Sequence, residues 1–593
     1  MRELEYPFDS EVIRKKRIKF RKNLLSDESV KYIEKRIAIL GGSTTSEIKN
    51  MIELFLLNNG IKPSFYESEY NKFYEDGMFD NPELVEFEPE IIYIHTSNRN
   101  IVNWPVVADK PEDVQALLDA EAGKFQGLWN HLFEKYHCPI IQNNFEMPFY
   151  RLLGNQDAVM VQGRSRFVNQ LNEMIYEYAR GHENFFIHDI NYEAAAYGLD
   201  EWSNPLYWHM YKYAVAVPAI PYTAYGVATI IKSIFGKNKK VIALDLDNTL
   251  WGGVIGDDGA ENIEIGQETS LGQTYSEFQN YVKEQKQIGA LLTVISKNND
   301  DVARTGFDRP DSVLKVDDFV SFKANWEPKD RNLVAEASLL NLLPESFVFV
   351  DDNPAEREIV RQSIPGVAVP EIGQVENYIQ TIDRAGYFEV TKLSADDLKR
   401  NEMCQANAKR NIAQASFTDY GDYLKSLEMV GTIKPFEDIY MSRIAQLSNK
   451  SNQFNLTTKR YTQAEIEETA SDGKYITLYG KLEDKFGDNG VVSVVIGEVK
   501  GDELHMDLWL MSCRVLKRDM EFAMMDELVA QAKVHCISTI YGYYYPTAKN
   551  SMVKDFYSLQ GFEKVSEDGD GNTTWKFEIT DDYKLKNNYI KVN

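Results

Sequence analysis

Short apolar runs alternate with segments of helical periodicity over the first 235 residues. Four of these runs have the length and the β-branched or aromatic content of strands: residues 36–40, 90–95, 138–141 and 185–188. An apolar-periodic helix follows the first run and passes through Phe55. Strands that alternate with helices form largely parallel sheets. This part of the chain therefore predicts an α/β domain.

Three further apolar runs, at residues 241–244, 290–295 and 347–350, indicate buried strands because their apolar character is continuous. Polar residues stand at or just after their ends. These residues are Asp245, Asp247, Thr249, Ser296, Asp351 and Asp352. Ligands bind at the carboxyl ends of parallel strands in open α/β sheets. We therefore expect these side chains to form one site, together with Lys329.

The chemistry of this set suits magnesium-dependent phosphoryl transfer. Asp245 could attack phosphorus and become an aspartyl phosphate, while Asp247 handles the proton of the leaving group or of water. Ser296 could offer its hydroxyl to a phosphate oxygen, and the Lys329 ammonium could neutralise phosphoryl charge. Mg²⁺ prefers hard oxygen ligands, among which we expect the backbone carbonyl of Asp247. The expected metal-ligating residues are Asp245, Asp247, Asp351 and Asp352. Taken singly, each residue is also typical of a turn or a surface.

The order of these elements resembles the haloacid-dehalogenase-like phosphatase superfamily. Residues 245–259 read DLDNTLWGGVIGDDG, 325–329 read NWEPK and 350–358 read VDDNPAERE, and these motifs resemble the FkbH-like subfamily. Segments 449–458 and 484–490 are similar to its C-terminal part, so the resemblance extends over about residues 236 to 570. It implies a Rossmann-like core. Few residues separate the first and second motifs, so we expect a minimal cap and an open site.

This resemblance also implies a function. Proteins of the subfamily move a three-carbon acyl unit, usually glyceryl from a phosphorylated glycerate, onto an acyl carrier protein with loss of phosphate. The implied partners are a small phosphorylated acyl substrate and an acyl carrier protein, in polyketide or cell-surface polysaccharide biosynthesis. The alternative is a simple phosphomonoesterase whose flanking domains bind partners. A protein phosphatase is one form of this alternative.

The GGST turn at residues 41–44 and Asn98 resemble the SGNH hydrolase pattern. The resemblance implies a three-layer, flavodoxin-like domain in which Ser43 is a nucleophile and Asn98 an oxyanion donor, as in an esterase of surface polysaccharide biosynthesis. A glycine replaces the Asp of that family's first motif, and His209 does not keep the spacing of its last motif. We therefore predict a degenerate hydrolase domain that acts as a docking or capping module, with Ser43 as a helix N-cap and His209 packed beside Trp208.

The last 200 residues carry two β-rich runs, 475–478 and 491–496, joined by an FGDNG turn that predicts a hairpin. A strand at 506–511 then leads into a helix, and this order resembles the GNAT acyltransferase fold. The resemblance implies an acyl-CoA loop with glycines at which backbone amides approach pyrophosphate. Lys517 and Asp519 occupy those positions, so we expect no tight CoA binding.

Cys513 is the remaining chemical candidate. It precedes the predicted helix, next to Arg514 and near Arg518, and such surroundings favour a thiolate. A thiolate there could hold the acyl group as a thioester between phosphate loss and the carrier thiol. A small buried apolar residue at a strand end is an equally weighted interpretation. No comparable context surrounds Cys138, Cys404 or Cys536.

The composition of the chain argues against some classes of binding partner. The 593 residues include 65 Lys and Arg against 91 Asp and Glu, a formal net charge of -26. Such a surface argues against nucleic acid and anionic membranes as partners, and docking of a phosphate or an acidic carrier protein requires a local basic patch. No apolar run reaches the length of a membrane span, and the charged start is no signal peptide, so we expect a cytoplasmic protein.

The length of the chain predicts three or four domains. A linker-like segment near residue 235 and the end of the phosphatase motifs divide it into residues 1–235, 236–390 and 391–593. The expected fold class is α/β multidomain. It comprises an SGNH- or flavodoxin-like three-layer domain, a haloacid-dehalogenase-like (HAD-like) Rossmann core with a minimal cap, and a GNAT-like α+β domain.

Overall fold

The computed structural model describes residues 1–393, 398–415, 417–547 and 549–593. The chain divides into two compact units, Met1–Ile234 and Phe235–Asn593. The first predicted boundary coincides with this division, whereas the predicted boundary at residue 390 falls inside the second unit and stays a prediction. None of the helices in the described ranges is long and apolar enough to cross a membrane.

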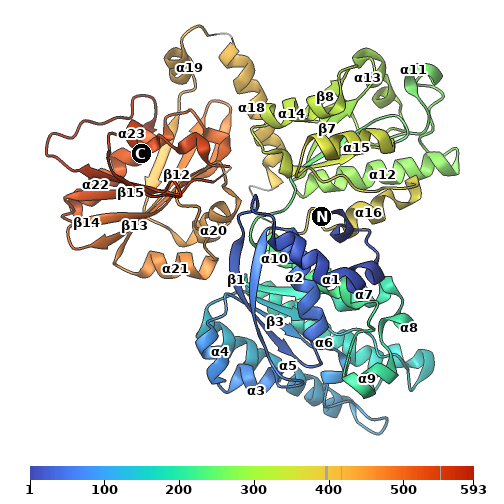
Figure 1. Ribbon diagram of the computed structural model, residues 1–593. Helices are drawn as coiled ribbons and strands as arrows, with labels where there is room; N and C mark the ends of the chain where they lie inside the picture. Colours follow the sequence, from blue (N-terminus) through green and yellow to red (C-terminus); the bar gives the residue numbers. More distant parts are fainter. Residues whose placement is uncertain (394–397, 416, 548) are drawn as a thin grey trace. The chain divides into compact units, whose positions relative to one another are not determined.

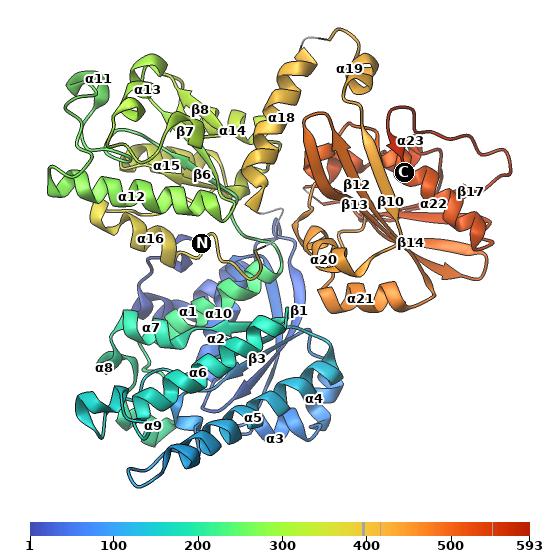
Figure 2. The same ribbon diagram turned by 180° about the vertical axis from the view of Figure 1, so that it is seen from behind.

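The first unit contains a five-stranded parallel sheet in the order β2-β1-β3-β4-β5 (Figure 1). Helices α2 and α10 cover one face of the sheet, and α5 and α6 cover the other (Figure 2). The strands are β1 Ile33–Gly41, β2 Ile61–Glu67, β3 Ile91–His95, β4 Ile140–Asn143 and β5 Phe185–His188. The helices are α1 Ser10–Leu25, α2 Ser46–Asn58, α3 Phe73–Met78, α4 Pro82–Phe87, α5 Pro111–Tyr136, α6 Arg164–Gly181, α7 Ile190–Tyr197, α8 Leu199–Trp202, α9 Pro205–Tyr211 and α10 Ile220–Ile234.

The four predicted strands of this unit are confirmed, but strand β2 was missed. It contains Pro63 and exposes Lys62, so it lacks the continuous apolar run of its neighbours. Proline cannot donate to a strand ladder and is therefore confined largely to edge strands. Strand β2 lies at the edge of the sheet, where such a sequence is tolerated.

The second unit begins with a four-stranded parallel sheet in the order β8-β7-β6-β9. Its strands are β6 Val241–Leu244, β7 Leu291–Ser296, β8 Ser321–Ala324 and β9 Phe347–Val350. Helices α14 and α15 pack on one face, in one apolar cluster with Val241, Ala243 and Phe349. Helix α12 covers the other face, as right-handed crossovers require. The helices are α11 Ile255–Asp258, α12 Ser270–Gln287, α13 Asp300–Asp308, α14 Lys329–Leu339, α15 Pro354–Ser363 and α16 Tyr378–Arg384.

Residues 245–269, all of which the structure describes, connect β6 to α12. Their one helix is the four-residue α11. A segment of this size adds no large cap over the carboxyl edge of the sheet, as the short spacing predicted.

Helices α18 Arg400–Ala415 and α19 Tyr420–Ser426 lead into a second sheet, ordered β16-β17-β15-β14-β13-β12-β10-β18. Its sides face two different apolar clusters, one built on α22 and the other on α20 and α21. The strands are β10 Val430–Lys434, β11 Phe454–Asn455, β12 Tyr475–Asp484, β13 Gly487–Lys500, β14 Glu503–Met511, β15 Thr539–Tyr544, β16 Glu563–Glu567, β17 Thr573–Glu578 and β18 Lys591–Val592. The remaining helices are α20 Met441–Lys450, α21 Gln463–Ser471, α22 Met520–Val534 and α23 Phe556–Leu559.

The predicted hairpin is confirmed, because β12 and β13 pair antiparallel. Its turn lies at Lys485 and Phe486, so residues 487–490 of the FGDNG segment belong to β13. Strand β14 pairs parallel with β15 over Glu503–His505 and also pairs with β11 near Met511. The backbone of Leu456 bridges the two parallel strands: its N–H donates to the Trp509 carbonyl at 3.1 Å, and its carbonyl accepts from the Tyr545 N–H at 2.9 Å. Residues 454–456 therefore fill the gap where β14 and β15 diverge.

Candidate active site

The loop after β6 carries the first predicted catalytic residues. Asp245 is 6% exposed, and its N–H donates to the carbonyl of Val350 in β9 at 3.0 Å. Asn248 adopts a left-handed conformation that turns the chain back. The hydroxyl of Thr249 accepts from the N–H of Asp352 at 3.1 Å. Thr249 thus fastens this loop to the loop after β9.

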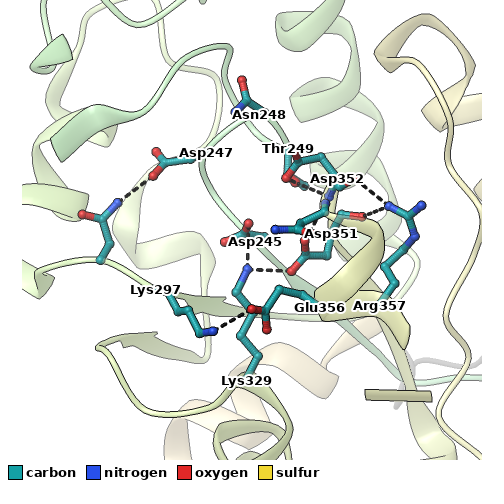
Figure 3. A network of polar contacts seen from close by, with 12 residues as sticks. Asp245, Asp247, Asn248, Thr249, Lys297, Lys329, Asp351, Asp352, Glu356 and Arg357 are labelled. Atoms are coloured by element: carbon teal, nitrogen blue, oxygen red, sulfur yellow. Dashed lines mark hydrogen bonds and ion pairs between the residues drawn. The ribbon is translucent and has the colours of Figure 1, made fainter. Parts of the chain in front are cut away.

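Lys329 lies between two buried carboxylates (Figure 3). Its Nζ is 2.8 Å from Asp245 Oδ2 and 2.6 Å from Asp351 Oδ2. Helix α14 begins at Lys329, directly after Pro328, so the side chain is placed by the start of a helix. Burial lowers the pKa of Lys329, but the two carboxylates outweigh it and the pKa is raised. The side chain therefore remains an ammonium.

Asp245, Asp351 and Asp352 form a cluster whose ligand oxygens lie within 4.8 Å of one another. Burial, and then the charge of Asp245, raises the pKa of Asp351 to about 7, against the lowering effect of Lys329. The pKa of Asp352 is also raised, first by burial. Protonation of either carboxyl group reduces the buried negative charge that the single Lys329 ammonium does not balance.

Asp245 Oδ1 is buried and has no hydrogen-bond partner. An unpaired carboxylate oxygen beside two further carboxylates is the donor set that Mg²⁺ prefers. The residues present therefore fit a magnesium ion, as predicted for Asp245, Asp351 and Asp352.

The Asp247 carboxylate is directed away from this cluster (Figure 3). Its Oδ1 accepts from Trp251 Nε1 at 3.0 Å and from the Ile255 N–H at 3.0 Å, and its Oδ2 accepts from Asn298 Nδ2 at 3.1 Å. Burial raises its pKa, although the bonds from Ile255 and Trp251 oppose this. Its side chain is therefore not part of the grouped carboxylates, and the predicted metal ligand, its backbone carbonyl, stays a prediction.

Ser296 is the last residue of β7 and is buried at the same edge of the sheet, beside β6. Sequence reasoning missed Arg357, whose guanidinium donates at 2.7 Å to the carbonyls of both Asp351 and Asp352. It also missed the ion pair of Lys297 with Glu356, at 2.6 Å, which lies near the cluster in Figure 3. Glu356 and Arg357 stood in the quoted motif at residues 350–358, whereas Lys297 lies outside the quoted motifs, and nothing in their spacing indicated their partners.

The predicted hydrolase residues of the first unit do not converge in the same way. The N-cap of α2 is Thr45, so the prediction of an N-cap at Ser43 is wrong, and the buried Ser43 hydroxyl has no partner. Asn98 donates its amide to the carbonyls of Glu146 and Met147. His209 is exposed on α9 rather than packed.

The buried histidines of this unit lie in a separate network. Asn143 Nδ2 donates to His95 Nδ1 at 3.0 Å, and its Oδ1 is 2.8 Å from His188 Nδ1. His188 Nε2 in turn lies 3.0 Å from Glu193 Oε1. Burial lowers the pKa of His95 to about 3, so it is neutral. Sequence patterns gave no signal for this network.

Cys513 opens a 3-10 helix and precedes α22 as predicted, but α22 begins seven residues later, so Cys513 is not at the helix N-terminus itself. The nearby Arg518 donates to Asp484 Oδ2 at 3.0 Å. Cys513 lines a cavity together with Cys404, a proximity that the sequence did not indicate. No residue of the Asp245 cluster is among the described residues that line this cavity.

Lys517 and Asp519 both adopt left-handed backbone conformations, with φ of 63° and 60°. Glycine adopts this conformation without strain, which explains why glycine is expected there and why a Cβ is costly. The filled gap between β14 and β15 adds a second obstacle to an extended ligand along β14. The expectation that CoA does not bind tightly therefore stays a prediction with structural support.

Comparison with known proteins agrees with this reading of the geometry. The model of the FkbH N-terminal domain matches residues 36–232, which is the region we compared with SGNH hydrolases rather than the region that carries the FkbH-like motifs. The chain is also similar to the N-terminal part of the protein BF1531 from Bacteroides fragilis, which contains a phosphatase domain and was crystallised with Mg. The identity is 29% and the TM-score 0.58, over 63% of this chain and 99% of that chain.

Two further solved structures match at lower similarity. The ribosomal-protein-S18-alanine N-acetyltransferase from Escherichia coli has 14% identity and a TM-score of 0.21, over 27% of this chain and 99% of that chain. Ard1 from Thermoplasma volcanium has 19% identity and a TM-score of 0.20, over 26% and 99%. No curated protein sequence matches the chain. A phosphatase-type site with a FkbH-type N-terminal domain is therefore the class that fold, site and comparisons support.

Proposed function

We propose that the second unit is a magnesium-dependent phosphatase in which Asp245 is the nucleophile. The observation that carries this proposal is the pairing of Asp245 Oδ2 with Lys329 while Oδ1, buried beside Asp351 and Asp352, has no partner. Asp245, Asp351 and Asp352 would hold Mg²⁺, which when bound neutralises carboxylate charge and polarises the phosphoryl group. Lys329 stabilises the charge that develops on the phosphoryl oxygens.

In the first step, a carboxylate oxygen of Asp245 forms a bond to phosphorus, and the bond from phosphorus to the substrate oxygen breaks. Asp247 gives its proton to that leaving oxygen, for which its raised pKa is suited. In the second step, water attacks phosphorus, Asp247 takes its proton, and the Asp245–phosphorus bond breaks. Phosphate leaves and both carboxyl groups return to their initial states.

We further propose that the substrate is a phosphorylated three-carbon acyl donor and that an acyl carrier protein receives the acyl unit. The FkbH-like motifs and the match of the N-terminal unit to the FkbH domain support this. A thiol sulfur, on Cys513 or on the carrier, attacks the carbonyl of the acyl phosphate. The carbon–oxygen bond to phosphate breaks, a thioester forms, and the thiol proton leaves with the phosphate.

The test is an intact-mass measurement on the protein and on a holo acyl carrier protein from the same genome, after incubation with Mg²⁺ and 1,3-bisphosphoglycerate. We expect a glyceryl-sized gain on the carrier protein that is absent with Asp245→Asn. Phosphate release without any adduct would instead establish the simple phosphomonoesterase. Absence of both phosphate release and adduct contradicts the whole proposal.

A further inference from the structure

A basic cavity of about 140 Å³ lies within the second unit, outside the Asp245 cluster. Five cationic side chains line it: Lys240, Arg400, Arg443, Lys450 and Arg514. No aspartate or glutamate is among the lining residues that the structure describes. In a chain of net charge -26, such a lining is far from the average composition of the surface. It is a local basic region of the kind that docking of an anion requires.

The cationic residues come from separate parts of the unit. Arg400 begins α18, and its guanidinium donates to the carbonyl of Gly289 at 2.7 Å. Arg443 lies on α20, and Arg514 lies in the turn after β14 and donates to the Ser512 hydroxyl at 3.2 Å. These two bonds help to hold the guanidinium groups in place. Arginine held in this way is well suited to bind phosphate oxygens with paired hydrogen bonds.

The remaining wall of the cavity offers a different chemistry. Gln453 Oε1 is buried and has no hydrogen-bond partner, so it can accept from a hydroxyl or amide of a ligand. Cys513 and Cys404 also line the wall, and burial raises the pKa of Cys404 to about 12, so it is a neutral thiol. Asn341 fixes the Cys513 segment by donating to its carbonyl at 2.6 Å. A ligand with an anionic end and a polar chain complements these surroundings.

The size of the cavity limits that ligand. Its volume of about 140 Å³ is close to the roughly 150 Å³ of an engineered cavity that binds benzene. A phosphate group and a few chain atoms fit, whereas a nucleotide does not. We propose that this cavity binds a phosphate ester with a short polar chain, beside the thiol of Cys513. A free phosphorylated hydroxy acid presents this chemistry as a whole molecule, whereas a phosphopantetheine arm presents it only with its phosphate end and the first atoms of its chain.

The test measures how fast iodoacetamide alkylates Cys513 in the full-length Asp245→Asn variant without Mg²⁺, so that turnover does not consume the ligand. Separate arms contain 3-phosphoglycerate, phosphopantetheine or neither. Cys536 is exposed and lies outside the cavity, so its alkylation is the control within the same molecule. We expect at least one phosphate ester to slow alkylation of Cys513 severalfold without affecting Cys536. The arm that protects identifies the source of the ligand.

The variants Arg514→Gln and Arg443→Gln should weaken this protection about tenfold in apparent affinity, because each removes a charge-assisted hydrogen bond. Lys533→Gln, on the exposed side of α22, is the matched control and should change nothing. Titration calorimetry with the same probes gives a second readout that does not depend on thiol reactivity. Unchanged Cys513 alkylation with both esters, together with equal binding heats in the Arg514→Gln, Arg443→Gln and Lys533→Gln proteins, would overturn the inference.

This inference is independent of the phosphatase proposal. Binding is measured without Mg²⁺ and without the Asp245 carboxylate, so protection of Cys513 stands even if the protein releases no phosphate. Conversely, phosphate release with an unprotected Cys513 would leave the proposed function intact and remove only the cavity assignment.

Discussion

Both units contain a parallel sheet with polar residues at its carboxyl edge, but the predicted side chains converge at only one of the two edges. After β6 and β9, Asp245, Lys329 and Asp351 meet within hydrogen-bond distance. After β1 and β3, the Ser43 hydroxyl has no partner and Asn98 donates to backbone carbonyls. Parallel topology brings polar residues to one edge in both cases. Chemistry requires in addition that their side chains converge on one another, and only the second unit achieves this among the predicted residues.

The largest expected effect is that of Asp245→Asn. The amide is nearly isosteric but cannot attack phosphorus, so release of phosphate from a phosphate monoester should fall by about 10³-fold or more. A colorimetric phosphate assay measures the rate. Ser43→Ala, the corresponding change at the other sheet edge, should retain the full rate. A loss of similar size in Ser43→Ala would reverse the comparison.

Replacement of Lys329 by Met should cost roughly 3 kcal/mol of folding free energy, because it leaves two buried carboxylates without their cation. We expect a lower thermal midpoint that Mg²⁺ partly restores, together with a severe loss of phosphate release. Lys425→Met makes the same change at an exposed lysine, 3.5 Å from the exposed Asp422, and should be nearly neutral. Equal midpoints for the two variants would show that the cluster does not depend on its ammonium.

The pH dependence of stability should report Asp351. Its pKa in the folded protein is about 7, above the ordinary value of 3.8, so the native state binds more protons between these values. Without metal, the contribution of Asp351 to stability is therefore greatest at low pH and is lost as pH rises toward 7. Mg²⁺ competes with this proton and should raise the thermal midpoint more at pH 8 than at pH 5. The assignment is contradicted if Mg²⁺ raises the thermal midpoint equally at both pH values. It is also contradicted if the Asp351→Asn variant shows the same difference between pH 8 and pH 5 as the unmodified protein.

Trp251→Phe removes the indole N–H that holds Asp247 and should lower the rate of phosphate release about tenfold. The pH profile of the rate should also shift, because the proton donor loses one of its hydrogen bonds. Trp326→Phe is the control: its indole, 71% exposed, donates to Asn299 instead. Identical rates and profiles in the two variants would remove the positioning role of Trp251.

The smallest effect is expected for the stability of the Ser43→Ala variant. Removing a buried hydroxyl without a partner is neutral or slightly stabilising. Thr45→Ala, by contrast, removes a hydrogen bond of 2.8 Å to Glu67 and should cost about 1 kcal/mol. Chemical unfolding of the two variants measures the difference. A larger loss in Ser43→Ala would reveal a partner for this hydroxyl and weaken the contrast between the units.

The sequence predicted those parts of the site that depend on local patterns of apolar residues. Continuous apolar runs located β6, β7 and β9, and the residues after them therefore lie at one edge of the sheet. The direction of the Asp247 side chain did not follow, because Trp251, Ile255 and Asn298 reach it only through tertiary structure. Strand β2 was missed because an edge strand needs no continuous apolar run.

The errors around Cys513 and Ser43 have a related cause. The Ser43 prediction named an N-cap for a helix that begins at Ser46, and the Cys513 prediction relied on a helix that begins only at Met520. The position of a helix boundary depends on the backbone geometry of a few residues. The pattern of side chains predicts this geometry only weakly. The cavity shared by Cys404 and Cys513 joins residues more than 100 positions apart, so no local pattern could indicate it.

The central claim is that Asp245 carries the phosphoryl group during turnover. We would stop the reaction with acid after a short incubation with Mg²⁺ and a phosphate monoester, and map phosphorylated peptides by mass spectrometry. The account predicts a phosphoryl group on Asp245 that is absent without Mg²⁺ and in Asp245→Asn. Steady phosphate release with an unmodified Asp245, or undiminished release by Asp245→Asn, would contradict it.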